Sequence, residues 1–282
     1  MEKRKRAMVL NDISVSSEYS LTVALPVLSA AEVETSIIPT SVLSTHIGGF
    51  TDSLYRDLPK AIPEVAQHGQ TLNLNLDAIY TRYIASFAQM KIVSQFIDRF
   101  SGNDTLIFVD PVMADNSERY QCSNLDFSQG MINLCGKADV IVPNMDEAMQ
   151  LLDQPYREGP YSHEYIDQIL ESLGKLGPKQ VILTGVYFDD RHLGAAAYNR
   201  LTGEIDYILS EWITGSFHGT GDVFASALLS AILKGLPVPK ATRIAVDFTV
   251  GSILRAKKAG TDIRFGANFG AGIPEFVKRL SC

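Results

Sequence analysis

Residues 105–115 read Thr-Leu-Ile-Phe-Val-Asp-Pro-Val-Met-Ala-Asp. The first five residues, Thr105–Val109, form a mostly apolar run without alternation, and such a run predicts a strand that is buried on both faces. Strands of this kind occur mainly in parallel sheets that helices cover on both sides. The stretch therefore favours an α/β fold, with polar residues placed directly after the strand.

Short apolar runs like this one recur along the chain and alternate with segments of helical periodicity. The other predicted strands are Ala7–Leu10, Ser36–Ile38, Ala78–Tyr83, Asp139–Val142, Gln180–Leu183, Ala195–Asn199 and Asp206–Leu209. The predicted helices are Leu21–Ala31, Leu54–Gln67, Ala85–Phe100, Asn144–Leu152, Glu164–Leu176, Asp222–Lys234, Val238–Lys258 and Ile273–Leu280. This alternation indicates a three-layer α/β fold, in which a central, mostly parallel sheet has helices on both faces. No internal repeat or linker divides the sequence, so we expect one domain over residues 1–282.

Composition and charge exclude several classes of protein. Of the 282 residues, 46% are hydrophobic and 20% are charged, which is enough for a large buried core and excludes a disordered chain. The net charge of −7 disfavours a nucleic-acid partner. No apolar stretch approaches the ~20 residues that span a bilayer, and the N-terminal residues do not resemble a secretory signal. The three cysteines show no CxxC spacing. We therefore expect a reduced, cytoplasmic protein that binds neither a membrane nor nucleic acid.

Familiar motifs that would assign other chemistry are missing. The first predicted strand is followed by Asn11-Asp12-Ile13-Ser14 and not by the GxGxxG of a dinucleotide-binding fold. The sequence also contains no Walker A, GxSxG or HExxH motif.

The strongest positive signal is Gly219-Thr220-Gly221-Asp222, which precedes a helical run. Two glycines before a helix allow a tight turn whose free N–H groups, together with the helix dipole, can bind a phosphate. A carboxylate at the same place, Asp222, suits a base that takes a proton from a hydroxyl attacking that phosphate. The alternative is that Asp222 only caps the helix and the glycines only form a turn. The motif by itself leaves both interpretations open.

Three further motifs follow predicted strands, where ligands of parallel sheets bind. Asp110 and Asp115 offer two carboxylates that could hold Mg²⁺ near nucleotide phosphates, although aspartates also cap turns. Asn144 and Glu147 have the spacing of a capping box, and Glu147 could instead orient a metal-bound water. Thr184, followed by glycine, could contact a phosphate. Their joint placement supplies the groups that ATP-dependent transfer needs.

Taken as an ordered set, these motifs resemble the ribokinase-like superfamily and, within it, the pyridoxal/pyridoxamine kinases. The resemblance spans nearly the whole chain. The matching segments are Asn11–Ser14 (NDIS), Ser20–Pro26 (SLTVALP), Val42–Phe50 (similar to VLSNHTGF), Tyr80–Tyr83 (similar to YTGY), Asp110–Asp115 (similar to DPVMGD), Pro143–Ala148 (PNxxEA) and Gly219–Asp222 (GTGD).

The resemblance implies a kinase that uses ATP and Mg²⁺ to phosphorylate the 5′-hydroxymethyl group of a vitamin B6 vitamer. It also implies a homodimer without a separate lid domain. Asp222 would be the base, and the N–H groups of Gly219, Thr220 and Gly221 would stabilise the transferring phosphoryl group. The expected nucleotide-side residues are Asp110, Asn144, Glu147 and Thr184, the expected metal ligands are Asp110, Asp115 and Glu147, and the expected substrate-side residues are Asp12, His46 and Tyr83.

The chain departs from the family pattern mostly on the substrate side. Val15 and Arg82 stand where glycines are usual, and Ile47 stands where a threonine is usual. Loss of a glycine restricts the backbone, and Ile47 cannot hydrogen-bond a ring substituent. Two alternatives therefore stay open. One is a related kinase that acts on hydroxymethylpyrimidine or another small alcohol. The other is a catalytically silent homologue that only binds its ligand.

Overall fold

The computed structural model of the chain describes residues 4–45, 50, 52–71, 75–115, 118–119, 125–215 and 217–281. The strands are β1 (Arg6–Ser14), β2 (Glu34–Leu43), β3 (Tyr55–Asp57), β4 (Ala78–Thr81), β5 (Leu106–Val109), β6 (Ala114–Asp115), β7 (Glu118–Arg119), β8 (Val140–Ile141), β9 (Gln180–Val186), β10 (His192–Asn199) and β11 (Ile205–Glu211). The helices are α1 (Leu21–Ala30), α2 (Ala61–Thr71), α3 (Phe87–Phe100), α4 (Leu125–Cys135), α5 (Met145–Leu151), α6 (His163–Gly174), α7 (Thr220–Leu233), α8 (Val238–Ala259) and α9 (Ile273–Leu280).

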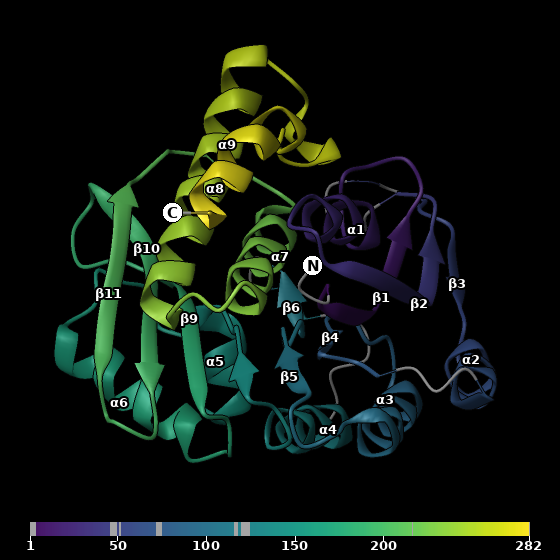
Figure 1. Cartoon of the computed structure of the whole chain (residues 1–282). Helices are drawn as coiled ribbons and strands as arrows, with labels where there is room; N and C mark the ends of the chain where they lie inside the picture. The colour runs from purple at the N-terminus through teal and green to yellow at the C-terminus, as the bar shows by residue number, and fades with distance from the viewer. Residues whose placement is uncertain are drawn as a thin grey trace.

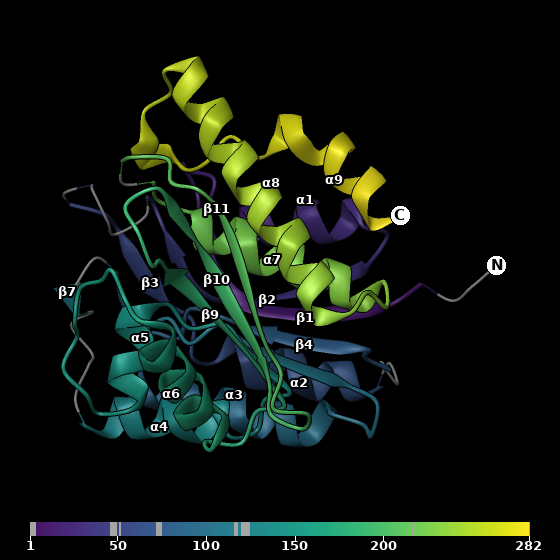
Figure 2. The same cartoon turned by 90° about the vertical axis from the view of Figure 1, so that its left-hand side faces the viewer.

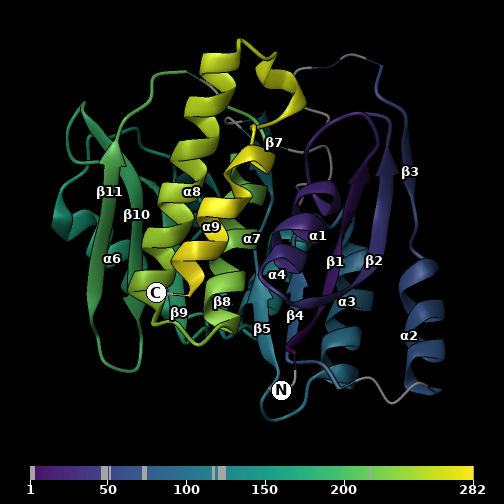
Figure 3. The same cartoon turned by 45° about the horizontal axis from the view of Figure 1, so that its top comes forward.

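Nine of the described strands form one sheet, in the order β11-β10-β9-β8-β5-β4-β1-β2-β3 (Figures 1 and 3). The six strands from β9 to β2 in this order run parallel to one another. At the two ends of the sheet the pairing is antiparallel: β3 pairs with β2 at one end, and β11 with β10 and β10 with β9 at the other. The predicted mostly parallel sheet is therefore confirmed. The antiparallel edges arise because short connections join these strands to their neighbours, whereas parallel neighbours need long crossovers.

Helices cover both faces of the sheet, which gives the expected three layers. α1, α7, α8 and α9 pack on one face, while α2 to α6 cover the other (Figures 1 and 2). The central strands send alternate side chains into the two layers. Val9 belongs to the core under α7, whereas its neighbours Met8 and Leu10 belong to the core on the opposite face. This alternation explains why the strand sequences are apolar throughout.

Two predicted segments differ from the structure. The predicted helix Leu54–Gln67 is wrong in its first part, because residues 55–57 form β3 and the helix begins only at Ala61. Pro59 explains the break, since a proline disfavours helical geometry at the residue before it. The second predicted strand, Ser36–Ile38, is too short. β2 continues through Pro39 to Leu43, and a register shift in its pairing with β1 accommodates the proline.

Sequence patterns also missed α4 and the small hairpin of β6 and β7. No helix in the described part of the chain is both long and apolar enough to span a membrane.

Candidate active site

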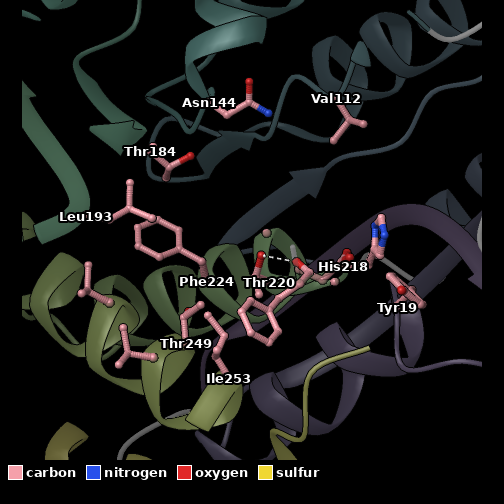
Figure 4. Close-up of a pocket in the computed structure, with 18 of the residues that line it drawn as sticks. Tyr19, Val112, Asn144, Thr184, Leu193, His218, Thr220, Phe224, Thr249 and Ile253 are labelled. Carbon is pink, nitrogen blue, oxygen red and sulfur yellow. Dashed lines mark hydrogen bonds between the residues drawn. The ribbon is translucent and has the colours of Figure 1, made fainter. Parts of the chain in front are cut away.

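A cavity of about 470 Å³ opens where the carboxyl ends of the central strands face the N-terminus of α7 (Figure 4). Its lining comes from the tips of the sheet, from Tyr19 before α1, from Gly215 and Phe217–Asp222, and from one side of α7 and α8. The residues that line it are Tyr19, Arg82, Val112, Asn144, Glu147, Thr184, Gly185, Leu193, Gly194, Gly215, Phe217, His218, Gly219, Thr220, Gly221, Asp222, Phe224, Val246, Thr249, Val250 and Ile253. The structure thus brings seven of the predicted site residues to one cavity: Asn144, Glu147, Thr184, Gly219, Thr220, Gly221 and Asp222.

The N-terminus of α7 is formed by a glycine in the left-handed conformation. Gly219 has φ of 76°, and a Cβ there would lie 3.0 Å from the Glu18 carbonyl oxygen. Thr220 begins the helix, and its hydroxyl donates to the Phe217 carbonyl at 3.1 Å (Figure 4). The first N–H groups of a helix have no partner within it and point outward from its end, here into the cavity. This is the geometry of an anion-binding helix start.

Asp222 lies in the first turn of α7 and is only 2% exposed. The helix is capped by Gly219 and has no side-chain cap, so the capping interpretation of Asp222 is wrong. A buried carboxylate is unfavourable unless something compensates its charge. Here its Oδ1 faces the Arg82 Nη1 at 3.1 Å, although no described residue gives that oxygen a well-aligned hydrogen bond.

Arg82 connects the two carboxylates of the site. Its backbone N–H donates to the Leu10 carbonyl and so extends the ladder beyond the end of β4. Its Nε donates to the Asp110 Oδ2 at 2.7 Å, while Nη1 faces Asp222. Burial alone would lower the pKa of this guanidinium, but the charges of Asp222 and Asp110 outweigh that effect and raise it well above its usual value. Arg82 therefore keeps its positive charge between these two carboxylates.

Asp110 and Glu147 are buried carboxyl groups that influence one another. Burial raises the pKa of Asp110 to about 6, while Arg82 opposes the shift. Burial also raises the pKa of Glu147 well above its usual value, and the charge of Asp110 raises it further. Asp110 does not itself line the cavity but joins it through Arg82. Neither carboxyl group has its charge fully compensated, and together they offer oxygen ligands for a hard divalent cation.

The capping box predicted at Asn144 is present. The Asn144 Oδ1 accepts the Glu147 N–H at 2.9 Å, and the Glu147 Oε2 accepts the Asn144 N–H at 2.8 Å. Glu147 also lines the cavity, so its capping role and a role in the site coexist. Thr184 is held beside this turn because its N–H donates to the Pro143 carbonyl at 2.9 Å.

Of the residues expected on the substrate side, Asp12 lies within β1 at the register shift against β2. Bulged strands commonly redirect side chains next to active sites. Burial raises the pKa of Asp12 to about 6, a hydrogen bond with Ser20 opposes the shift, and the charge of Asp222 adds to it. Asp12 is therefore electrostatically coupled to the site, although it does not line the cavity.

Of the three other predicted residues, one does not line the cavity and two cannot be placed, because their side chains lie outside the described part of the chain. Tyr83 is half-buried, and its N–H donates to the Asn11 Oδ1 at 3.1 Å, but it is not part of the cavity wall. His46 lies outside the described residues, and so does the side chain of Asp115. Among the side chains that are described, no group of three or more His, Cys, Asp or Glu could hold a metal ion.

The apolar wall of the cavity could not be predicted from the sequence. Val246, Thr249, Val250 and Ile253 come from one side of α8, and Phe224 and Leu193 complete the wall (Figure 4). The spacing of the four α8 residues places them on one helix face, but core-facing residues have the same spacing. The only sequence feature that could have placed α8 at the cavity is therefore its position directly after the helix that begins with the GTGD motif. The arrangement joins an apolar wall to a polar end that carries N–H groups, carboxylates and one guanidinium.

Comparison with known proteins identifies relatives of this arrangement. The model of the phosphomethylpyrimidine kinase family matches residues 61–266. A protein of Bacteroides thetaiotaomicron VPI-5482, assigned as a phosphomethylpyrimidine kinase and crystallised with pyridoxal, is 32% identical. The match covers 99% of this chain and 96% of that one, with a TM-score of 0.91. The pyridoxal kinase of Lactobacillus plantarum is 27% identical, with 97% of both chains covered and a TM-score of 0.88.

A more distant relative is a larger protein. The probable chloroplastic thiamine biosynthetic bifunctional enzyme of rice, Oryza sativa subsp. japonica, is 24% identical over 199 residues, which are 66% of this chain. The chain spans only 33% of the length of that enzyme. The family match and the similarity to the solved structures nonetheless cover most of this chain, together with its sheet and its helix layers. The chain belongs to the phosphomethylpyrimidine kinase family and has the ribokinase-like fold that it shares with the pyridoxal kinases.

Proposed function

We propose that this protein is a kinase that transfers the γ-phosphate of ATP to the 5′-hydroxymethyl group of a vitamin B6 vitamer. The observation that carries the proposal is the position of Asp222. This carboxylate is buried in the first turn of α7, next to the glycine-bounded helix start and inside a cavity that reaches the tips of the sheet. A base and an anion-binding site are thereby adjacent, as phosphoryl transfer to an alcohol requires.

In the proposed reaction, the oxygen of the substrate hydroxyl attacks the γ-phosphorus while its proton moves to a carboxylate oxygen of Asp222. The bond between the γ-phosphorus and the bridging oxygen breaks, and ADP leaves with the electron pair of that bond. The N–H groups of Gly219, Thr220 and Gly221 stabilise the negative charge on the transferring group, because they are already oriented at the start of α7.

The cavity fits a nucleotide and a divalent cation. The apolar wall of Phe224, Leu193 and the α8 residues suits a purine base, and the polar end suits the phosphates. Mg²⁺ typically binds one or two carboxylates together with substrate phosphates. Glu147, which lines the cavity, and Asp110, which is joined to the cavity through Arg82, would hold it. Burial raises the pKa of both carboxyl groups, and a bound cation would stabilise their charged forms. The bound ion would neutralise charge on the phosphates.

Two ring systems are candidates for the acceptor. Crystallisation of the Bacteroides relative with pyridoxal favours vitamin B6, whereas the name of the matching family and the thiamine biosynthetic relative favour hydroxymethylpyrimidine. Both rings carry basic nitrogens. A buried carboxyl group whose pKa is about 6, such as Asp12, suits proton sharing with such a nitrogen. We place Asp12, Tyr83 and His46 on the acceptor side and keep hydroxymethylpyrimidine as the second candidate.

A silent ligand-binding protein is the alternative outside enzymes. Such a protein would gain little from a buried carboxylate beside an anion-binding helix start, because that carboxylate repels the bound phosphate. The single domain, the homodimer and the cytoplasmic location remain predictions that no observation above tests.

The test measures ADP release with ATP and Mg²⁺ in the presence of pyridoxal, pyridoxine, pyridoxamine or hydroxymethylpyrimidine. We expect turnover with at least one B6 vitamer. Asp222→Asn should lower kcat by about 10²- to 10⁴-fold, the range for loss of a general base. Asp98→Asn is the control, because Asp98 forms an exposed ion pair with Lys137 away from the cavity. Nucleotide binding by folded protein without turnover of any acceptor would refute the proposal, and turnover of hydroxymethylpyrimidine alone would select the second candidate.

A further inference from the structure

Arg82 has an unusual position among the charged groups of the cavity. It is the only Lys or Arg among the described residues that line the cavity, whereas Glu147 and Asp222 bring carboxylates to the same wall. Its side chain is only 15% exposed and is held by Asp110 through Nε. The orientation of the guanidinium is therefore set by contacts within the site and not by solvent.

The third nitrogen of this guanidinium faces the anion-binding helix start. Nη2 lies 2.7 Å from the position that a Cβ would occupy on Gly221, and it makes no hydrogen bond to a described residue. A phosphoryl group that accepts the N–H groups of the first turn of α7 would therefore lie within reach of Nη2. The planar, forked donor arrangement of arginine matches phosphate oxygens well.

The positive charge of Arg82 can offset the repulsion between Asp222 and a phosphoryl group. A phosphoryl group at the start of α7 must approach the negative charge of Asp222, which is buried and poorly hydrated. The cation that compensates Asp222 at 3.1 Å is Arg82, through an ion pair that lacks a well-aligned hydrogen bond. A weakly held pair of this kind can exchange one anionic partner for another at little cost. The Nε contact with Asp110 would keep the guanidinium in place during the exchange.

We propose that Arg82 binds the γ-phosphate of ATP and that, in doing so, its guanidinium leaves Asp222 and frees that carboxylate to accept the proton of the attacking hydroxyl. Arg82 is then a phosphate-binding residue that couples the arrival of the nucleotide to release of the base. The inference rests on the proposed function, because it takes ATP as the phosphoryl donor.

The test compares two nucleotides that differ in the γ-phosphate. The dissociation constants of AMP-PNP and of ADP, each with Mg²⁺, are measured by calorimetry for the wild type, Arg82→Gln, Arg82→Lys and Arg279→Gln. Arg279 is the matched control, because it is also ion-paired, to Asp247 and Glu275, but lies on α9 outside the cavity.

We expect Arg82→Gln to weaken AMP-PNP binding by about 10- to 100-fold, the range for a charge-assisted hydrogen bond, and to leave ADP binding within about twofold. Arg82→Lys keeps the charge but loses the fork, so it should give an intermediate loss for AMP-PNP alone. Because the lysine retains a cation between Asp110 and Asp222, this variant keeps the test valid if Arg82→Gln does not fold. In turnover assays, millimolar guanidinium should partly restore the activity of Arg82→Gln and should not affect the Arg279→Gln variant.

Several results would overturn the inference. Tighter AMP-PNP binding by Arg82→Gln would mean that the guanidinium obstructs the phosphate site. Equal weakening of AMP-PNP and ADP would mean that Arg82 only maintains the shape of the cavity. A wild-type protein that binds neither nucleotide would remove both this inference and the proposed function. By contrast, selective loss of AMP-PNP binding without turnover of any alcohol would refute the proposed function and leave Arg82 assigned to the γ-phosphate.

Discussion

Four carboxyl groups of the site, Asp12, Asp110, Glu147 and Asp222, are each 5% exposed or less. Burying charged groups without matched partners destabilises a fold, and Arg82 provides ion pairs for only two of them. Buried carboxyl groups with too few ion pairs are expected at sites whose residues are retained for activity at a cost in stability. It follows that removing one of these charges can stabilise the protein while it harms activity.

Asp12 allows a direct test of this trade-off. Burial raises its pKa from 3.8 to about 6 in the folded protein. Between these two values the folded state binds more protons than the unfolded state at this group. The contribution of Asp12 to stability is therefore most favourable below about pH 4 and is lost as the pH rises through about 6. The shift corresponds to about 2–3 kcal/mol. Asp12→Asn should therefore be more stable than the wild type by up to that amount at pH 8, and the difference should vanish towards pH 4.

Chemical denaturation of both proteins across this pH range provides the measurement, and the same samples should show reduced turnover for Asp12→Asn. A difference in unfolding free energy that stays constant with pH would show that Asp12 is not destabilised by its charge in the folded protein.

At the residue scale, the sequence predicted which residues line the site, but it did not predict which side chains contact one another. Asp222, Glu147 and Thr184 all line the cavity, because residues after parallel strands and at helix starts meet at one edge of the sheet. The position of Arg82 could not be predicted. Sequence comparison marked it only as a departure from glycine, and nothing in the sequence shows where a long flexible side chain will point.

At the scale of elements, local sequence predicts structure well where one pattern dominates. The helices α3 and α6 were anticipated to within a few residues, because their apolar positions repeat with helical spacing. The helix α7 is buried all round from Asp222 to Ala231, and it was anticipated from the glycine motif that precedes it. The segment at residues 54–67 combined a strand, a proline break and a helix in a short stretch, and the strand is stabilised by pairing with β2, which is a tertiary contact. Local patterns do not contain that information.

The glycine at the start of α7 leads to a prediction about the element as a whole. Gly219 and Gly203 both have φ of 76°, but a Cβ on Gly203 would meet no atom within 4 Å, whereas one on Gly219 would press on the Glu18 carbonyl oxygen and the Tyr19 ring. Alanine at either position should cost about 1–2 kcal/mol of stability, because the left-handed conformation is strained for residues with a Cβ. Only Gly219→Ala should also displace the first turn of α7.

Displacement of the first turn moves both the N–H groups and Asp222. A misplacement of about 1 Å can cost about 10²-fold in rate, so we expect Gly219→Ala to lose at least tenfold in kcat while Gly203→Ala retains wild-type activity. Thermal denaturation and turnover assays of the two variants, run together, separate strain from displacement. Equal turnover in both variants would mean that the helix start tolerates the shift and does not position the reacting groups.

For the whole molecule, the sheet connects two apolar cores that lie on opposite faces. In β9, Ile182 belongs to the core beneath α7 and α8, whereas Val181 and Leu183 belong to the core beneath α5 and α6. The same alternation occurs in β1 and in β4. Loss of either helix layer would therefore expose one face of every central strand to water. The two layers should not unfold separately, although 282 residues are enough for two domains.

Cavity-forming substitutions on each side of the sheet test whether the chain folds as one unit. Leu228 of α7 and Leu170 of α6 are both fully buried, one in each core. Replacement of a buried leucine by alanine costs about 2–5 kcal/mol, because it removes apolar contacts and leaves a cavity.

If the chain is one cooperative domain, Leu228→Ala and Leu170→Ala will each lower the Tm of a single calorimetric transition, and the double variant will lower it further, close to additively. If the layers were independent, calorimetry would resolve two transitions, and each substitution would move only its own. The cores meet through shared strands, so we expect the single transition, and a split one would overturn the assignment of residues 1–282 to one domain.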